Sequence, residues 1–331
     1  MEWKKHLKAH SLDILDITPH CMQKHLIVHL QLLAVAAIWG ASWTAGRIMA
    51  LEIPPITAAW LRYCIALACF FVWLKIKGEL HLPTKQQWKI ILLIGFFSTT
   101  VYQALFMFGM KYTAAGDASL MITLNPLFTA LLAIPLLSEK MNPRLGIGII
   151  IGFSGVLMLF LYSPNVDIPA SSRMLGDALI ATAALAWAAS SIMMKKAMTK
   201  PTRDAEQAMT PLTLTVWASV AGFLFLTPWA GWETTQSGIP SISAQAWWAT
   251  VFLAIFSTVI SYVWFANGIK VIGAGKAALY VYLVPPFGII TGWWLLDEKL
   301  GWSLVAAFIL IAGGVALAQS DKRHQQATPG E

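Results

Sequence analysis

The sequence predicts an all-α integral membrane protein whose ten transmembrane helices form a 5+5 inverted repeat. Only 12% of its 331 residues are charged and 57% are hydrophobic, whereas a soluble domain carries about 25% charged residues. Ten apolar segments are long enough to cross a bilayer, which takes about 20 residues as a helix. Residues 106–156 also recur as residues 265–315, with 18 identities over 51 ungapped positions.

The chain begins and ends with polar segments. Residues 1–27 contain no short apolar core followed by a cleavage site, so we expect a cytoplasmic tail and not a signal peptide. Translation could start at Met1 or at Met22. Residues 320–331 form a second polar tail. The three cysteines have neither a disulfide pattern nor metal-ligand spacing, so no metal and no cofactor is expected.

The first predicted repeat covers residues 28–162 and holds five spans. Pro54-Pro55 separates the first two spans, and Lys77-Gly78 ends the second. Pro143 begins the fifth, because proline fits the first turn of a helix. The five spans are residues 28–50, 56–77, 88–110, 114–137 and 143–162.

The second predicted repeat covers residues 175–319. Its internal loops near residues 197–208 and 231–244 are too short for a soluble domain, and no P-loop occurs. This excludes ATP-driven transport by this chain alone. The five spans are residues 175–196, 209–230, 245–270, 275–296 and 301–319.

Basic residues predict the orientation of the chain. If the N-terminus is cytoplasmic, 18 lysines and arginines lie on the inner side and four on the outer side. Cytoplasmic loops carry an excess of such residues, so both termini are predicted to be cytoplasmic. With five spans per repeat, the two copies must then insert in opposite directions. Asp117 at the predicted outer start of span four corresponds to Lys276 at the inner start of span nine, as this inversion requires.

The pattern resembles the drug/metabolite transporter superfamily, EamA-type, over residues 28–319. The motifs that carry the resemblance are Trp39-Gly40-Ala41-Ser42, Pro54-Pro55, Arg62-Tyr63, Asn125-Pro126, Glu139-Lys140, Pro285 and Glu298-Lys299. The resemblance implies a ten-helix permease with a central cavity, most of whose relatives export amino acids, metabolites or xenobiotics. It does not identify a substrate.

Two prolines mark candidate gating helices. Pro126 and Pro285 lie about halfway along spans four and nine, and Pro286 follows the second. Proline removes a backbone donor and should kink each helix. Asn125, just before the first kink, could bind a polar group of a substrate or cap the broken helix.

Aromatic and small polar residues share helix faces and predict an apolar, aromatic cavity with few polar anchors. Such stripes also face neighbouring helices or lipid, so each residue is a candidate only. The candidate substrate-binding residues are Trp39, Ser42, Tyr102, Gln103, Asn125, Trp187, Ser190, Tyr262, Asn267 and Tyr282.

Charged residues in the spans are interpreted as mainly structural. Arg62, inside span two, could snorkel or pair with Glu52, and binding a substrate carboxylate is the bolder alternative. The two Glu-Lys pairs, at residues 139–140 and 298–299, are expected to cap or anchor hairpin turns. No Asp or Glu lies near the centre of any span, so proton coupling has no support from the sequence.

Transport is the leading functional hypothesis. We expect a secondary-active or facilitative transporter of the plasma (inner) membrane that exports small metabolites, such as amino acids or amphipathic and aromatic compounds, by alternating access. A nucleotide-sugar or sugar-type carrier is the alternative within transport. An integral-membrane lipid-modifying enzyme is disfavoured because paired acids and metal motifs are missing, and no repeated filter sequence indicates a channel.

The expected partners are a small-molecule substrate and the lipid bilayer, with no nucleic acid. Glycines on spans five and ten permit close helix contact, either within one chain or across a homodimer. These glycines are Gly146, Gly148, Gly152, Gly155, Gly313 and Gly314.

Overall fold

The computed structural model describes residues 19–78, 80–138, 141, 143–199, 210–238 and 240–327, with the side chains of these residues except 19–25, 199, 274–275 and 320–327. All regular structure in these ranges is helical. In chain order the elements are α2 (Pro19–Glu52), α3 (Pro55–Lys77), α4 (Lys85–Gly95), η1 (Phe96–Val101), α5 (Tyr102–Tyr112), α6 (Ala115–Met121), η2 (Ile122–Leu124), α7 (Asn125–Leu137), α8 (Pro143–Tyr162), α9 (Ala170–Thr199), α10 (Pro211–Ser237), α11 (Ala244–Val251), η4 (Phe252–Ile260), α12 (Ser261–Ile272), α13 (Ala274–Val281), α14 (Val284–Leu296) and α15 (Trp302–Ala327).

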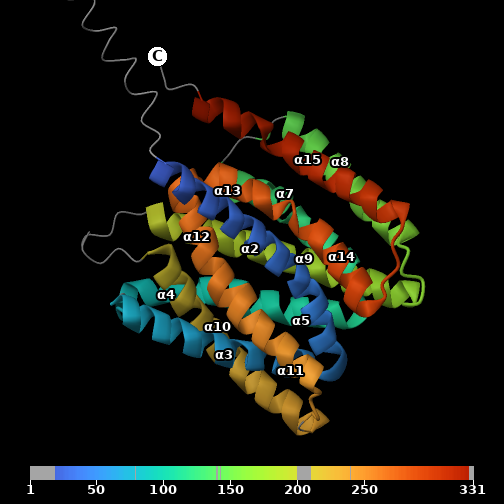
Figure 1. The fold of residues 1–331 in the computed structure, drawn as a ribbon, viewed down its shortest axis with the longest axis horizontal. Helices are drawn as coiled ribbons and strands as arrows, with labels where there is room; N and C mark the ends of the chain where they lie inside the picture. Colours follow the sequence, from blue (N-terminus) through green and yellow to red (C-terminus); the bar gives the residue numbers. More distant parts are fainter. Residues whose placement is uncertain are drawn as a thin grey trace, which may run out of the picture.

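These elements make ten helices that are long and apolar enough to cross a membrane, which confirms the ten predicted spans. Six spans are single helices, namely α2, α3, α8, α9, α10 and α15. The other four, spans three, four, eight and nine, are interrupted. Figure 1 shows the helices side by side in a bundle, with α15 along α8 at one edge.

The interruptions fall at corresponding places of the two predicted repeats. Span three contains a π-helix at Phe96–Val101, and span eight contains one at Phe252–Ile260. Span four passes through a short 3-10 helix, Ile122–Leu124, just before Pro126. Span nine has a turn, closed by the Tyr282 amide on the Leu279 carbonyl, just before Pro285. The two members of each pair are separated by close to 159 residues, the offset of the sequence repeat.

Small residues let the spans cross closely. A Cβ atom added at Gly148 would meet the carbonyl oxygen of Gly314, and the reverse also holds, so α8 and α15 touch through their backbones. Gly152 and Gly155 also face neighbouring residues of the same chain, whereas Gly146 and Gly313 have open space beside them. Four of the six glycines therefore serve contacts inside one chain.

Three glutamates cap helices at the end of the bundle where α2 ends, which we call the Glu298 end. A carboxylate at a helix N-terminus accepts hydrogen bonds from the free amides there and interacts favourably with the positive end of the helix dipole. Glu298 accepts hydrogen bonds from the amides of Ala115 and Gly116, Glu233 from those of Ile56 and Thr57, and Glu52 from that of Ser243. Each cap joins a residue of range 28–162 to one of range 175–319, so the two ranges are held together at this end.

Candidate functional site

Arg62 is the centre of the candidate site. It lies seven residues into α3, roughly 10 Å along the helix at 1.5 Å per residue, and only 7% of it is exposed. Its Nε and Nη2 donate to the hydroxyl of Thr258 at 3.3 and 2.9 Å, and its Nη1 donates to Gln103 Oε1 at 3.2 Å. Spans two, three and eight thus meet at one guanidinium group.

The two groups that bind Arg62 are fixed as acceptors. The Thr258 hydroxyl donates its proton to the carbonyl of Leu253, five residues back in the π-helix, at 2.8 Å. The Gln103 amide nitrogen donates to the Tyr63 hydroxyl at 3.1 Å, which leaves its oxygen toward Arg62. The π-helix of span eight therefore has a local function: it holds a hydroxyl acceptor against a buried cation. We call Arg62, Tyr63, Gln103 and Thr258 the Arg62 cluster.

No carboxylate balances Arg62 within the described residues. The rings of Tyr63 and Phe106 lie 5.9 and 6.0 Å from its guanidinium carbon and supply cation–π contacts. A buried charge without a counter-ion costs several kcal/mol in practice. The cluster is therefore an electropositive site at membrane depth.

Aromatic side chains from four spans surround the Arg62 cluster. Trp39 donates to the carbonyl of Ser257 at 3.0 Å, next to Thr258, and its ring lies 5.1 Å from that of Phe265 and 6.3 Å from that of Tyr262. Tyr102 stacks 6.2 Å from Phe106, whose ring contacts Arg62, and lies 5.1 Å from Trp187. We call these six residues, Trp39, Tyr102, Phe106, Trp187, Tyr262 and Phe265, the aromatic shell.

The structure thus brings five of the ten candidate binding residues together. These are Trp39, Tyr102, Gln103, Trp187 and Tyr262. The other five make polar contacts outside the Arg62 cluster. Ser42 and Ser190 donate to carbonyls of their own helices, Asn125 accepts from Thr129, Asn267 donates to Gln31, and Tyr282 lies 3.5 Å from Gln319.

The interpretation of Arg62 as a snorkelling residue or a partner of Glu52 is wrong. The carboxylate of Glu52 binds the amide and hydroxyl of Ser243, and the side chain of Arg62 is buried. Thr258 was also missed, although a signal exists: Phe97-Ser98-Thr99 recurs as Phe256-Ser257-Thr258 at the same 159-residue offset. This repeated triplet lies in the π-helix of each repeat.

The prolines begin the second segment of each broken span. Pro126 stands in the first turn of α7 and Pro285 in the first turn of α14, followed by Pro286. Asn125 accepts a hydrogen bond from the Thr129 hydroxyl at 3.2 Å through its amide oxygen, within α7 itself. A role of these breaks in gating stays a prediction.

A second set of buried polar groups lies at the Glu298 end. Asp117 accepts from Ser163 at 2.6 Å and from Asn165 at 3.1 Å, and its carboxylate is 3.8 Å from Arg173 Nε. Asp177 accepts from the Thr113 hydroxyl at 2.6 Å. Both aspartates are fully buried. Asp117 lies in the first turn of α6, as expected of an acid near a span end, whereas Asp177 lies seven residues into α9. The sequence did not indicate that both are buried in one polar network.

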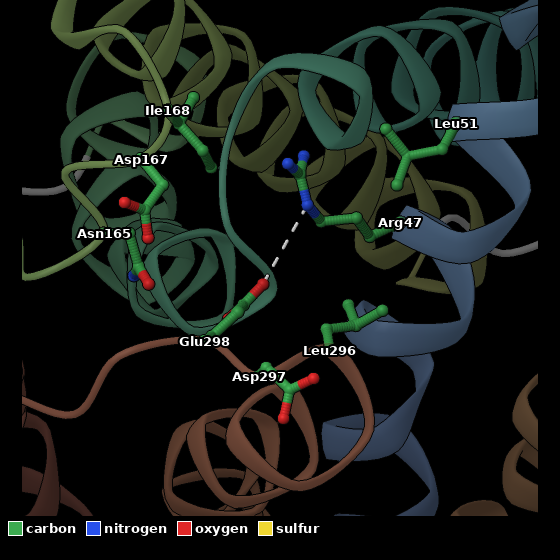
Figure 2. Close-up of a pocket in the computed structure, with 8 residues that line it drawn as sticks. All are labelled: Arg47, Leu51, Asn165, Asp167, Ile168, Leu296, Asp297 and Glu298. Atoms are coloured by element: carbon green, nitrogen blue, oxygen red, sulfur yellow. Dashed lines mark ion pairs between the residues drawn. The ribbon is translucent and has the colours of Figure 1, made fainter.

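Arg47 and Glu298 connect this network to a small pocket. Their side chains approach to 4.0 Å, and Arg47 also donates to the carbonyls of Met110 and Thr113. Figure 2 shows Arg47 and Glu298 facing each other across the pocket, whose volume is about 180 Å³. Burial raises the pKa of Glu298, and its bonds to two amides and the charge of Arg47 oppose this shift. Glu298 caps α6, the start of span four in the other repeat, and not the hairpin turn between spans nine and ten that was expected. Glu139 and Lys140 lie outside the described residues.

Comparison with known proteins fits this arrangement. The model of the EamA-like transporter family matches twice, at residues 26–161 and 174–319. The chain belongs to the EamA-like transporter family. It is therefore a multi-pass membrane protein of a transporter family, and two matches of one family model agree with the internal repeat.

Several relatives extend over nearly the whole chain. An uncharacterized transporter of Bacillus subtilis, YyaM, is 29% identical over 88% of this chain and 95% of its own. An uncharacterized transporter of Archaeoglobus fulgidus is 27% identical over 90% and 98%. A probable amino-acid metabolite efflux pump of Escherichia coli is 26% identical over 85% and 91%.

A solved crystal structure shares the fold. It aligns with a TM-score of 0.55 and 20% sequence identity, covering 90% of this chain and 98% of its own. At this identity the likeness concerns the arrangement of helices alone.

Proposed function

We propose that the protein is a secondary-active or facilitative transporter that exports small amphipathic or aromatic metabolites, such as amino acids, across the plasma (inner) membrane by alternating access. One observation carries the proposal. The Arg62 cluster and the aromatic shell combine a polar anchor with apolar walls, drawn from spans one, two, three, six and eight. Ligand sites have this composition, with few polar groups on a mostly apolar lining.

The contacts at the Glu298 end support alternating access. Three carboxylate caps and the ion pair between Arg47 and Glu298 join the two halves there. A transporter that rocks one repeat against the other must make and break such contacts at each end in turn. The Glu298 end would then be the closed gate of this conformation, on the outer side if both termini are cytoplasmic.

Export of amino-acid metabolites also agrees with the name of the relative from Escherichia coli. That name describes the relative, and its sequence identity of 26% leaves the substrate of this chain to be measured. Since the family hosts many substrates on one scaffold, the side chains of the site must decide the question.

The test is transport by the purified full chain in proteoliposomes. Labelled aromatic and aliphatic amino acids are loaded, and efflux is followed with and without a pH gradient. We expect efflux of at least one aromatic compound, and a loss of about tenfold or more in Trp39→Ala and Tyr102→Ala, because each removes a wall of the shell. Trp248→Ala is the matched control, since Trp248 is 74% exposed on α11 and away from the shell.

Two outcomes would contradict the proposal. Vesicles that release no compound of the panel faster than protein-free vesicles would argue against amino-acid export. Equal losses in Trp39→Ala and Trp248→Ala would show that the shell is not the site.

The orientation is tested separately with reporters fused to the C-terminus, where an active periplasmic reporter and an inactive cytoplasmic one would reverse the predicted topology.

A further inference from the structure

We infer that Arg62 binds the carboxylate of the transported compound and that this compound is an organic monoanion with an apolar or aromatic body. The inference rests on the proposed function and narrows its substrate class to carboxylates that need no ammonium group, so it departs from the amino acids named there, which are zwitterions at neutral pH. It follows from the hydrogen-bond donors that remain unused around Arg62, from the charge of the cluster, and from the aromatic residues packed around it.

The Arg62 cluster has unused hydrogen-bond donors, whereas its acceptors are already occupied. A guanidinium group has five N–H donors, and the described hydrogen bonds of Arg62 are three, to Thr258 and Gln103. The Tyr63 hydroxyl accepts from Gln103, so its own proton remains available to donate. The complement of such a site is a group that only accepts, and a carboxylate is one.

Two further hydroxyl groups stand nearby. Tyr102 stacks on Phe106, whose ring faces Arg62, and Tyr262 packs against Trp39, which binds the carbonyl next to Thr258. Neither hydroxyl makes a hydrogen bond to another described residue. Both side chains are only half-buried, although Arg62 beside them is buried. These two hydroxyls are therefore further unused donors on residues that pack around the Arg62 cluster.

The charge of the cluster favours a single negative charge on the ligand. Arg62 is its one cation, and the buried acids Asp117, Asp177 and Glu298 lie in the separate network at the Glu298 end. A monoanion would neutralise the site, whereas a dianion would leave a net charge in a medium of low dielectric constant. The cluster also offers no carboxylate to an ammonium group, so recognition of the ligand does not depend on an amine.

The aromatic shell defines the rest of the ligand. Phe106 lies against both Arg62 and Trp43, Trp39 packs on Phe265, and Trp187 packs on Tyr102. Rings in edge-to-face and offset arrangements accept a further ring readily. An aromatic or branched apolar body attached to the carboxylate would pack against these rings.

The test compares ligands that share a phenyl ring and carry different anchoring groups. Binding of 3-phenylpropionate to the full chain in nanodiscs is measured by isothermal titration, beside its uncharged amide, 3-phenylpropylamine and phenyl phosphate. We expect the acid to bind at least 30-fold more tightly than the amide, because charge-assisted hydrogen bonds contribute more than neutral ones. We expect weaker binding still for the amine, and weaker binding of the doubly charged phosphate than of the acid.

Variants then assign the preference to Arg62. In Arg62→Gln the acid and the amide should bind within about threefold of each other, and Arg62→Lys should keep part of the preference since it keeps the charge without the planar fork. Lys85→Gln is the control, because it removes an exposed positive charge at the start of α4. Thermal unfolding of each variant checks that it is folded.

The outcomes separate this inference from the proposed function. Equal binding of acid and amide to the wild type would overturn it without any variant, as would an absence of binding or tighter binding of phenyl phosphate. A preference for the acid that persists in folded Arg62→Gln would overturn the role of Arg62. Binding that depends on Arg62 without flux in proteoliposomes would support the inference and reject transport. Flux of the amide at the rate of the acid would support transport and reject the inference.

Discussion

Ser138 and Asp297 lie 159 residues apart and end corresponding helices with the same unusual backbone, at φ 56° and 53°. They are the two non-glycine residues with positive φ in the described part of the chain. The amide of Ser138 binds the carbonyl of Ala133, and that of Asp297 binds the carbonyl of Gly292, again 159 residues apart. The sequence repeat is thus a repeat of hydrogen bonds as well.

This geometry predicts the effect of side-chain shape at residue 297. A β-branched residue is strained in the left-handed region, at about 1–2 kcal/mol, and glycine is not. We expect Asp297→Val to lower the melting temperature of the detergent-solubilised protein and Asp297→Gly to leave it equal or higher. Ser138→Gly and Ser138→Val should follow the same order. A melting temperature of Asp297→Val at or above that of Asp297→Gly would contradict the assigned backbone.

The spans and hairpins could be predicted from the sequence because they depend on local properties. Length and hydropathy define a span, and proline or glycine marks its ends, as at Pro55 and Gly78. Identical residues at a fixed offset predicted which hairpins correspond. The inversion of the two repeats is a consequence of the charge pattern and stays a prediction.

The site could be predicted only in part, because periodicity shows that residues share a face and not what that face meets. Trp39 and Ser42 share a face, yet Trp39 reaches Ser257 on another span while Ser42 binds its own helix. Arg62 was assigned to Glu52 because the two are near in sequence, but its partners are 41 and 196 residues away. The π-helix that positions Thr258 has no signature in hydropathy.

The contact between α8 and α15 predicts opposite effects at neighbouring glycines. A Cβ at Gly148 or Gly314 would collide with backbone atoms of the other helix, whereas Gly146 and Gly313 have open space. We expect Gly148→Ala and Gly314→Ala to lower the free energy of unfolding by about 1–3 kcal/mol through overpacking. Gly146→Ala and Gly313→Ala should be neutral or stabilising by up to about 1 kcal/mol, because alanine favours helix. Equal melting temperatures for the two pairs would show that the helices are further apart than described.

Glu298 predicts a pH dependence of stability. Burial raises its pKa in the folded protein above its usual 4.5, so the folded state binds more protons than the unfolded state in this range. Stability from this group is then fully present below pH 4.5 and is lost as the pH rises through the raised pKa. The melting temperature of the wild type minus that of Glu298→Gln should therefore fall from pH 4 to neutral pH. A rise of this quantity with pH would mean that Arg47 and the two amides outweigh burial.

The stability losses of variants at Arg173 and Asp177 should be non-additive, because this one cation lies beside two buried acids. It lies 3.8 Å from Asp117 and one helical turn from Asp177, whose second oxygen accepts no hydrogen bond within the described residues. Arg173→Gln should leave two buried carboxyl groups without their shared cation and destabilise the protein by about 3–5 kcal/mol. Asp177→Asn removes one of these acids and should cost far less. In the double variant, Asp177→Asn should therefore recover part of the stability that Arg173→Gln loses, which melting temperatures in a double-mutant cycle can measure. Additive losses, or a loss in Asp177→Asn as large as that in Arg173→Gln, would show that the two aspartates do not share this cation.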